Sequence, residues 1–175
     1  MHHIGKARTR STGGLTRRST TGGFTLIELL TVISIIGLLA SMIIVSLNSA
    51  RKSGRATRAI ADLRQISNAL EYYYQDNNSY PNSGGNWDGL YSCWGDSMTD
   101  WIPALTPNYI PELPHAPDNS MNCDKQYIYF SDGKEYKLIW HNADNADKVV
   151  AAYPLLADPQ RPYAFGFYSS GGTDF

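Results

Sequence analysis

The chain has 175 residues and a formal net charge of −1, which leaves room for one or two folded domains. Its charge is uneven, because residues 1–23 hold five basic residues and no acidic one, whereas residues 75–175 hold 13 acidic residues and five basic ones. Proteins that bind nucleic acid directly use clustered lysine and arginine. The acidic C-terminal part therefore argues against direct nucleic-acid binding.

An apolar stretch follows the polar leader. Residues 1–23 are rich in serine, threonine, glycine and arginine, and cannot form a core. From Phe24 to Leu47 the only charged residue is Glu28. At about 1.5 Å per residue this stretch forms a helix of about 36 Å, enough to cross the apolar layer of a bilayer and too long for an ordinary secretory signal. We therefore expect a membrane-spanning helix over residues 24–48.

The orientation of this span decides the compartment of the rest of the chain. Basic residues lie on both sides of the span, so the positive-inside rule hardly distinguishes between the two orientations of the helix in the membrane. The leader is short and wholly basic, which favours a cytoplasmic leader and an extracytoplasmic domain. In that compartment Cys93 and Cys123 are expected to form a disulfide, and two unrelated buried thiols are the alternative. Two cysteines without a paired motif do not predict a structural zinc site.

The helix is expected to continue beyond the membrane. Residues 49–76 carry apolar side chains every three or four positions, which form one stripe on an otherwise polar helix. No proline lies between Phe24 and Ser79, so the sequence predicts one helix of about 50 residues that ends at Asp76-Asn77-Asn78. The stripe consists of Ala56, Ala59, Ile60, Leu63, Ile66, Ala69, Leu70, Tyr73 and Tyr74.

The remaining residues predict a small antiparallel sheet after a long irregular connection over residues 82–124. Two runs of aromatic and β-branched residues, 126–130 and 135–140, flank Asp132-Gly133, a pair typical of a hairpin turn. Their alternating aromatic residues are interpreted as sheet core, and a sugar-binding or adhesive surface is the alternative. Weaker strand candidates lie at residues 149–153 and 163–168.

The stretch Gly23-Phe24-Thr25-Leu26-Ile27-Glu28, after a basic leader and before an apolar helix, resembles the prepilin signature of type IV pilins and of the pseudopilins of type II secretion. Residues 69–81 resemble the end of the long helix in the major pseudopilin, and residues 105–114 resemble the helix-to-sheet loop of that group. The resemblance implies an α+β, pilin-like fold, in which a long N-terminal helix packs against a small antiparallel sheet.

The resemblance also divides the chain. It implies that residues 1–23 are a cleaved leader, 24–48 the transmembrane and filament-core helix, 49–76 its amphipathic continuation, and 77–175 an extracytoplasmic head.

Processing and assembly follow from the same resemblance. A prepilin peptidase is expected to cut between Gly23 and Phe24, and the new amino group of Phe24 is expected to be methylated. An assembly ATPase and an inner-membrane platform protein would then draw subunits from the membrane lipid into a helical homopolymer. An unpaired carboxylate in an apolar layer costs several kcal/mol, and the resemblance implies that Glu28 pairs with the Phe24 ammonium of a neighbouring subunit. The alternative is a carboxylate stabilised by the helix dipole that reaches the lipid headgroups.

Some features depart from the resemblance. The apolar helix lacks the proline that many pilins carry. A disulfide between Cys93 and Cys123 would close a loop within the irregular connection that precedes the sheet. The major pseudopilin often ends in a calcium-binding loop, but the oxygen donors here fit no calcium spacing, so they are interpreted as solvated acidic surface and no metal is expected. These donors are Asp144, Asn145, Asp147, Asp158 and Asp174. Arg55 and Arg58, with Arg51 and Lys52, are expected to contact acidic faces of adjacent subunits, and anionic lipid headgroups are the alternative.

No catalytic motif accompanies these features. His115 and His141 stand alone in the sequence, and no nucleophile elbow or phosphate-binding glycine loop is present, so we expect neither enzymatic activity nor a cofactor. The chain is expected to be a structural subunit of a type IV pilus-like filament, first in the inner membrane and then in an extracellular pilus or periplasmic pseudopilus. One alternative is the major pseudopilin of a type II secretion system. A second is a membrane-anchored binding protein that never polymerises.

Overall fold

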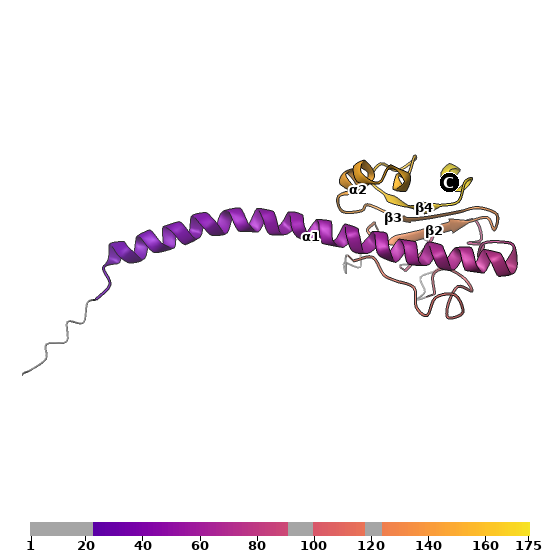
Figure 1. The fold of residues 1–175 in the computed structure, drawn as a ribbon, viewed down its shortest axis with the longest axis horizontal. Coiled ribbons are helices and arrows are strands. Elements are labelled where there is room, and N and C mark those ends of the chain that lie inside the picture. The colour runs from indigo at the N-terminus through magenta and orange to yellow at the C-terminus, as the bar shows by residue number, and fades with distance from the viewer. Residues whose placement is uncertain (1–22, 91–99, 118–123) are drawn as a thin grey trace, which may run out of the picture. The chain divides into compact units, whose positions relative to one another are not determined.

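The computed structural model describes residues 23–90, 100–117 and 124–175. The chain forms two compact units, Met1–Met42 and Ile43–Phe175, and the first helix contributes to both. The elements, labelled in Figure 1, are α1 (Leu26–Asn77), β1 (Asp88–Gly89), β2 (Tyr127–Ser131), β3 (Tyr136–Trp140), α2 (Ala146–Ala152), the 3₁₀ turn η2 (Pro154–Leu156), β4 (Phe165–Tyr168) and the 3₁₀ turn η3 (Gly172–Asp174).

Helix α1 begins and ends where local chemistry requires. Thr25 precedes the helix and Glu28 is its third residue, so the pair forms a capping box that satisfies free amide groups of the first turn. At the other end Asn78 adopts a positive φ of 53°, a conformation in which the helix cannot continue. The long helix predicted from the missing proline and the Asp76-Asn77-Asn78 stop is confirmed.

The sheet of the second unit is antiparallel with the strand order β1-β2-β3-β4. Strands β2 and β3 form the predicted hairpin, in which Ser131 pairs with Tyr136 and Tyr127 pairs with Trp140. In the turn the Asp132 carboxylate accepts hydrogen bonds from the amides of Lys134 and Glu135, and Gly133 takes a φ of 93° that disfavours other residues. The α+β fold class is therefore confirmed.

The second half of α1 packs on one face of this sheet, and Figure 1 shows the strands lying alongside it. The predicted stripe supplies the contacts, since Leu63, Ile66 and Leu70 are fully buried. From the sheet, Tyr127 donates a hydrogen bond to Asp62, 3.0 Å between oxygens, and Tyr136 shares one with Ser67 at 2.9 Å. The aromatic residues of the strands thus form core, as predicted.

The described part of the irregular connection is anchored by apolar side chains. Among residues 100–117, Ile102, Leu105 and Leu113 are fully buried in the cluster that includes the stripe of α1. Tyr109 packs edge-on against Tyr73, with 5.2 Å between ring centroids. The connection therefore has a hydrophobic attachment to the head apart from any disulfide.

Three sequence expectations need correction. Residues 149–153 are not a strand but lie largely in α2, because alanines favour the helix and Val149 is its buried contact. The connection contains a two-residue strand, β1, that periodicity could not detect. Asp144 and Asp158 are buried and paired with basic side chains, so their interpretation as solvated surface is wrong. The strand expected at 163–168 is present as β4.

Candidate functional site

The expected cleavage position lies in exposed, non-helical backbone directly before α1. Gly23 and Phe24 are both exposed, and Phe24 retains 91% of its accessible surface. A Cβ atom built on Gly23 would meet no atom within 4 Å. The folded chain therefore imposes no steric need for glycine here, and a requirement for glycine would have to come from a molecule that acts on this bond.

Glu28 is held by the residue that begins the helix. Its Oε2 accepts hydrogen bonds from the Thr25 amide at 2.9 Å and from the Thr25 hydroxyl at 2.7 Å, while the Glu28 amide donates to Thr25 Oγ1 at 3.3 Å. Sequence analysis missed this role of Thr25, although the spacing Thr-x-x-Glu signals a capping box. Both bonds reach the same oxygen, so among the described residues Oε1 remains open to another donor.

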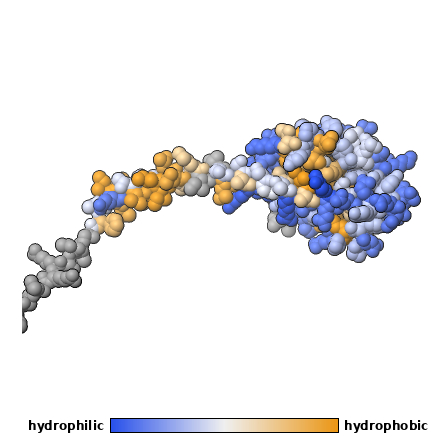
Figure 2. Space-filling view, viewed as in Figure 1, coloured by the Kyte–Doolittle hydropathy of each residue, from blue (hydrophilic) through white to orange (hydrophobic). Residues whose placement is uncertain are grey.

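None of the described residues covers the apolar half of α1. Its described large side chains, from Phe24 at 91% to Leu47 at 46%, are all exposed, and Figure 2 shows them as an apolar surface along the first part of the helix. This segment is long and apolar enough to cross a membrane, and none of it is buried. Water is a poor environment for a surface of this kind, so it requires lipid or another protein.

Two of the basic residues beyond this segment, Arg55 and Arg58, have partners within the chain. Arg55 donates to Asp144 through Nε, at 2.6 Å, and also contacts it through Nη2, while Lys125 reaches the other carboxylate oxygen at 3.4 Å. Arg58 approaches Asp62, one turn along the helix, at 3.4 Å. Both charges therefore have a partner within the chain, and the expected contact of Arg55 and Arg58 with adjacent subunits stays a prediction.

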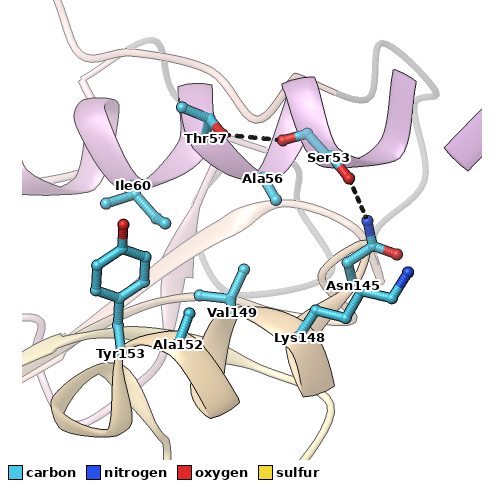
Figure 3. Close-up of a pocket in the computed structure, with 9 residues that line it drawn as sticks. All are labelled: Ser53, Ala56, Thr57, Ile60, Asn145, Lys148, Val149, Ala152 and Tyr153. Atoms are coloured by element: carbon cyan, nitrogen blue, oxygen red, sulfur yellow. Dashed lines mark hydrogen bonds between the residues drawn. The ribbon is translucent and has the colours of Figure 1, made fainter. Parts of the chain in front are cut away.

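A shallow groove lies between α1 and α2, lined by Ala56 and Ile60 on one side and by Val149 and Tyr153 on the other (Figure 3). Asn145 donates to the Ser53 hydroxyl at 3.4 Å across one end of it. The labelled side chains provide no carboxylate, imidazole or thiol. Its polar groups are hydroxyls, the Asn145 amide and the Lys148 amine, and with its apolar walls the groove has the character of a packing seam between two helices.

Metal-binding side chains do not cluster among the described residues. Across residues 23–90, 100–117 and 124–175, no three His, Cys, Asp or Glu side chains gather closely enough to hold one. Asp144 and Asp158 are separately engaged by basic side chains. Cys93 and Cys123 lie outside the described residues, and their pairing stays a prediction.

A basic leader, an exposed apolar helix that starts with a capped glutamate, and an amphipathic continuation packed on a small antiparallel sheet together define a protein of the pilin and pseudopilin class. The model of the prokaryotic N-terminal methylation motif matches residues 18–44, which include Gly23, Phe24 and Glu28. Eight curated relatives carry the name type II secretion system core protein G. Because one of them is 34% identical and is matched over 72% of its length, the chain belongs to this pseudopilin family.

Three of these relatives show the extent of the similarity. The protein of Dickeya chrysanthemi is 34% identical over 118 residues, 66% of this chain and 72% of the relative. That of Pectobacterium carotovorum is 38% identical over 97 residues, 54% and 60% of the two chains, and that of Escherichia coli K12 is 33% identical over 90 residues, 51% and 58%. The match spans about half the length of several relatives, from 48% to 58%, and no solved structure matches the chain.

Proposed function

We propose that this chain is the major pseudopilin of a type II secretion system, a structural subunit that polymerises through its N-terminal helix. The observation that carries the proposal is the uncovered apolar half of α1, with a carboxylate in its first turn. The relatives' shared name favours this role over the type IV pilus subunit that the sequence first indicated. The role is structural and involves no catalysis by the chain.

The apolar helix is covered in two successive states. In the first, residues 24–48 cross the inner membrane as a single span, with the leader in the cytoplasm and the head outside. In the second, the same surface packs against identical helices in the filament core. In a helical homopolymer the apolar surface of each helix is buried against the same surface of neighbouring subunits.

The first turn of α1 links cleavage after Gly23 to the pairing of Glu28 in the filament. Cleavage after Gly23 creates an ammonium on Phe24, one residue before the Thr25 amide that already binds Glu28. Oε1 of Glu28 then receives the ammonium of a neighbouring copy, while Oε2 keeps its bonds to Thr25. This pairing neutralises a carboxylate that would otherwise be expensive to bury. A prepilin peptidase, an assembly ATPase and a platform protein are the partners that this route requires.

The experiment replaces the major pseudopilin gene of a secreting host with the gene of this chain. Glu28→Ala should leave membrane insertion intact and abolish both sheared filaments and secretion. Gly54→Ala is the control within the same helix, because Gly54 lies beyond residues 24–48 and a Cβ there meets no atom within 4 Å. Normal filaments in the Glu28→Ala strain would refute the proposed role of that residue.

Processing is tested separately by intact mass. Gly23→Val should retain the leader, whereas Gly22→Val, the neighbouring glycine, should still be cut, and the wild-type subunit should begin with a methylated Phe24. A wild-type chain with an uncut leader would contradict the proposal. Long surface pili that depend on a retraction motor would favour the type IV pilus instead, and a processed chain that never enters a filament would favour an anchored binding protein.

A further inference from the structure

A buried lysine lies at the centre of an oxygen-lined site between β3 and the last described residues. Lys137 belongs to β3, and its side chain and that of Asp158 are both 0% exposed. Its Nζ donates to Asp158 Oδ1 at 3.1 Å, to the main-chain oxygen of Thr173 at 3.2 Å and to that of Phe175 at 2.6 Å. An ammonium has three donors, and here each of them has an acceptor.

Asp158 also accepts hydrogen bonds from two other residues. Asp158 Oδ1 receives the amide of Gln160 at 2.9 Å in addition to Lys137, and Oδ2 receives Arg161 Nη1 at 3.2 Å. Arg161 donates in turn to the oxygen of Phe175 at 3.2 Å. The buried Asp158 carboxylate thus interacts with two cationic side chains, those of Lys137 and Arg161. Burial lowers the pKa of Lys137 from its ordinary value, and Asp158 opposes that shift.

The site fastens residues 171–175 to the sheet. The ring of Phe175 packs against Phe130 of β2 with 4.6 Å between centroids, and Arg161 stacks on Trp87 at 4.6 Å. Gly172 lies so close to the Tyr136 carbonyl that no side chain could be accommodated there. Residues 171–175 are therefore held by hydrogen bonds to the buried Lys137, by the packing of Phe175 on Phe130 and by the close approach of Gly172 to Tyr136.

A carboxylate and converging main-chain carbonyls are also the donors that calcium selects, usually six to eight oxygens at about 2.3–2.6 Å. In this chain three oxygens of these kinds, from Asp158, Thr173 and Phe175, surround a covalently attached charge. We propose that the ammonium of Lys137 takes the place of a bound divalent cation, so that residues 171–175 dock and the head folds without calcium. The inference concerns the head alone and does not depend on filament formation.

The first test measures thermal unfolding of the full-length chain in detergent, in excess EDTA and in millimolar calcium chloride. Tryptophan fluorescence reports the head, since every tryptophan lies beyond residue 86. Equal Tm values in the two buffers are the expected result. A ligand present well above its Kd stabilises the folded state by an amount that raises Tm by several degrees, so a calcium-dependent rise would overturn the proposal.

The second test asks whether Lys137 itself holds the segment. Lys137→Met should accelerate hydrogen exchange of the amides of residues 171–175 at least tenfold and lower Tm, because it leaves Asp158 buried with one cation fewer. Lys134→Met is the matched control, since Lys134 is exposed three residues earlier. Unchanged exchange in the Lys137 variant would overturn the assignment. If this variant does not fold, the buffer comparison on the wild-type chain decides alone.

Discussion

The contact between Arg55 and Asp144 should hold α1 against the segment that leads into α2. The two residues are 89 positions apart, and Asp144 keeps only 7% of its side-chain surface whereas Arg55 keeps 34%. Removing one partner of a fully buried pair costs about 3–5 kcal/mol. Arg55 is partly solvated and Lys125 also reaches Asp144, so we expect Arg55→Met to lower the free energy of unfolding by about 1–3 kcal/mol.

A double-mutant cycle with Arg55→Met and Asp144→Asn isolates this contact. Guanidinium unfolding of the full-length chain in detergent, followed by tryptophan fluorescence, gives the four free energies. The coupling energy is expected to be about 1–2 kcal/mol, because the arginine loses a charged, well-aligned acceptor. Arg58→Met is the control: its side chain is 60% exposed and its pair with Asp62 spans 3.4 Å, so the loss should stay below about 0.5 kcal/mol. A coupling energy near zero, or equal losses for Arg55 and Arg58, would refute the reasoning.

Three further predictions follow from single contacts. Thr25→Val removes the cap of α1 and should reduce sheared filaments, whereas Thr25→Ser keeps the hydroxyl and should assemble normally; equal yields from the two variants would contradict this. Burial raises the pKa of Tyr136 from 10.0 to about 12, so roughly 3 kcal/mol of stability is present below pH 10 and is lost as the pH rises to about 12. Tyr136→Phe should flatten that part of the loss in unfolding measured against pH. Gly166→Ala should unfold the head, because its Cβ would overlap the Leu138 carbonyl, whereas Gly54→Ala on open helix surface should raise Tm slightly.

The elements that the sequence predicted well are those whose signals are local. The stripe of α1 repeats over many turns, and Asp132-Gly133 between two aromatic runs specifies a hairpin whatever surrounds it. Residues 149–153 were misjudged because two adjacent valines resemble a strand, while the choice of a helix depends on the burial of Val149 beside α1. A two-residue strand such as β1 has no periodicity of its own and forms only because β2 offers it an edge.

The candidate site divides in the same way. Gly23, Phe24 and Glu28 could be selected from the motif alone, and the capping role of Thr25 was also readable from its spacing to Glu28. The burial of Asp144 could not be read, because its partner is distant in the chain. The same holds for Lys137, which stands in a strand of aromatic and aliphatic residues and becomes a buried cation only when residues 158–175 fold over it.

These pairings restrict the charges that remain for assembly. Arg55 and Arg58 are engaged within the chain, whereas Arg51 and Lys52 are exposed directly beyond the apolar segment and have no side-chain partner among the described residues. Electrostatic contact with neighbouring subunits or with anionic headgroups should therefore depend on the latter two. Reversing Arg51 and Lys52 to glutamate should reduce filament yield and flatten its dependence on salt while leaving unfolding of the head unchanged. Arg55→Glu should instead destabilise the head. If the Arg51/Lys52 reversal and Arg55→Glu changed filament yield and head stability in the same way, the proposed distinction between charges used for assembly and charges used for folding would be wrong.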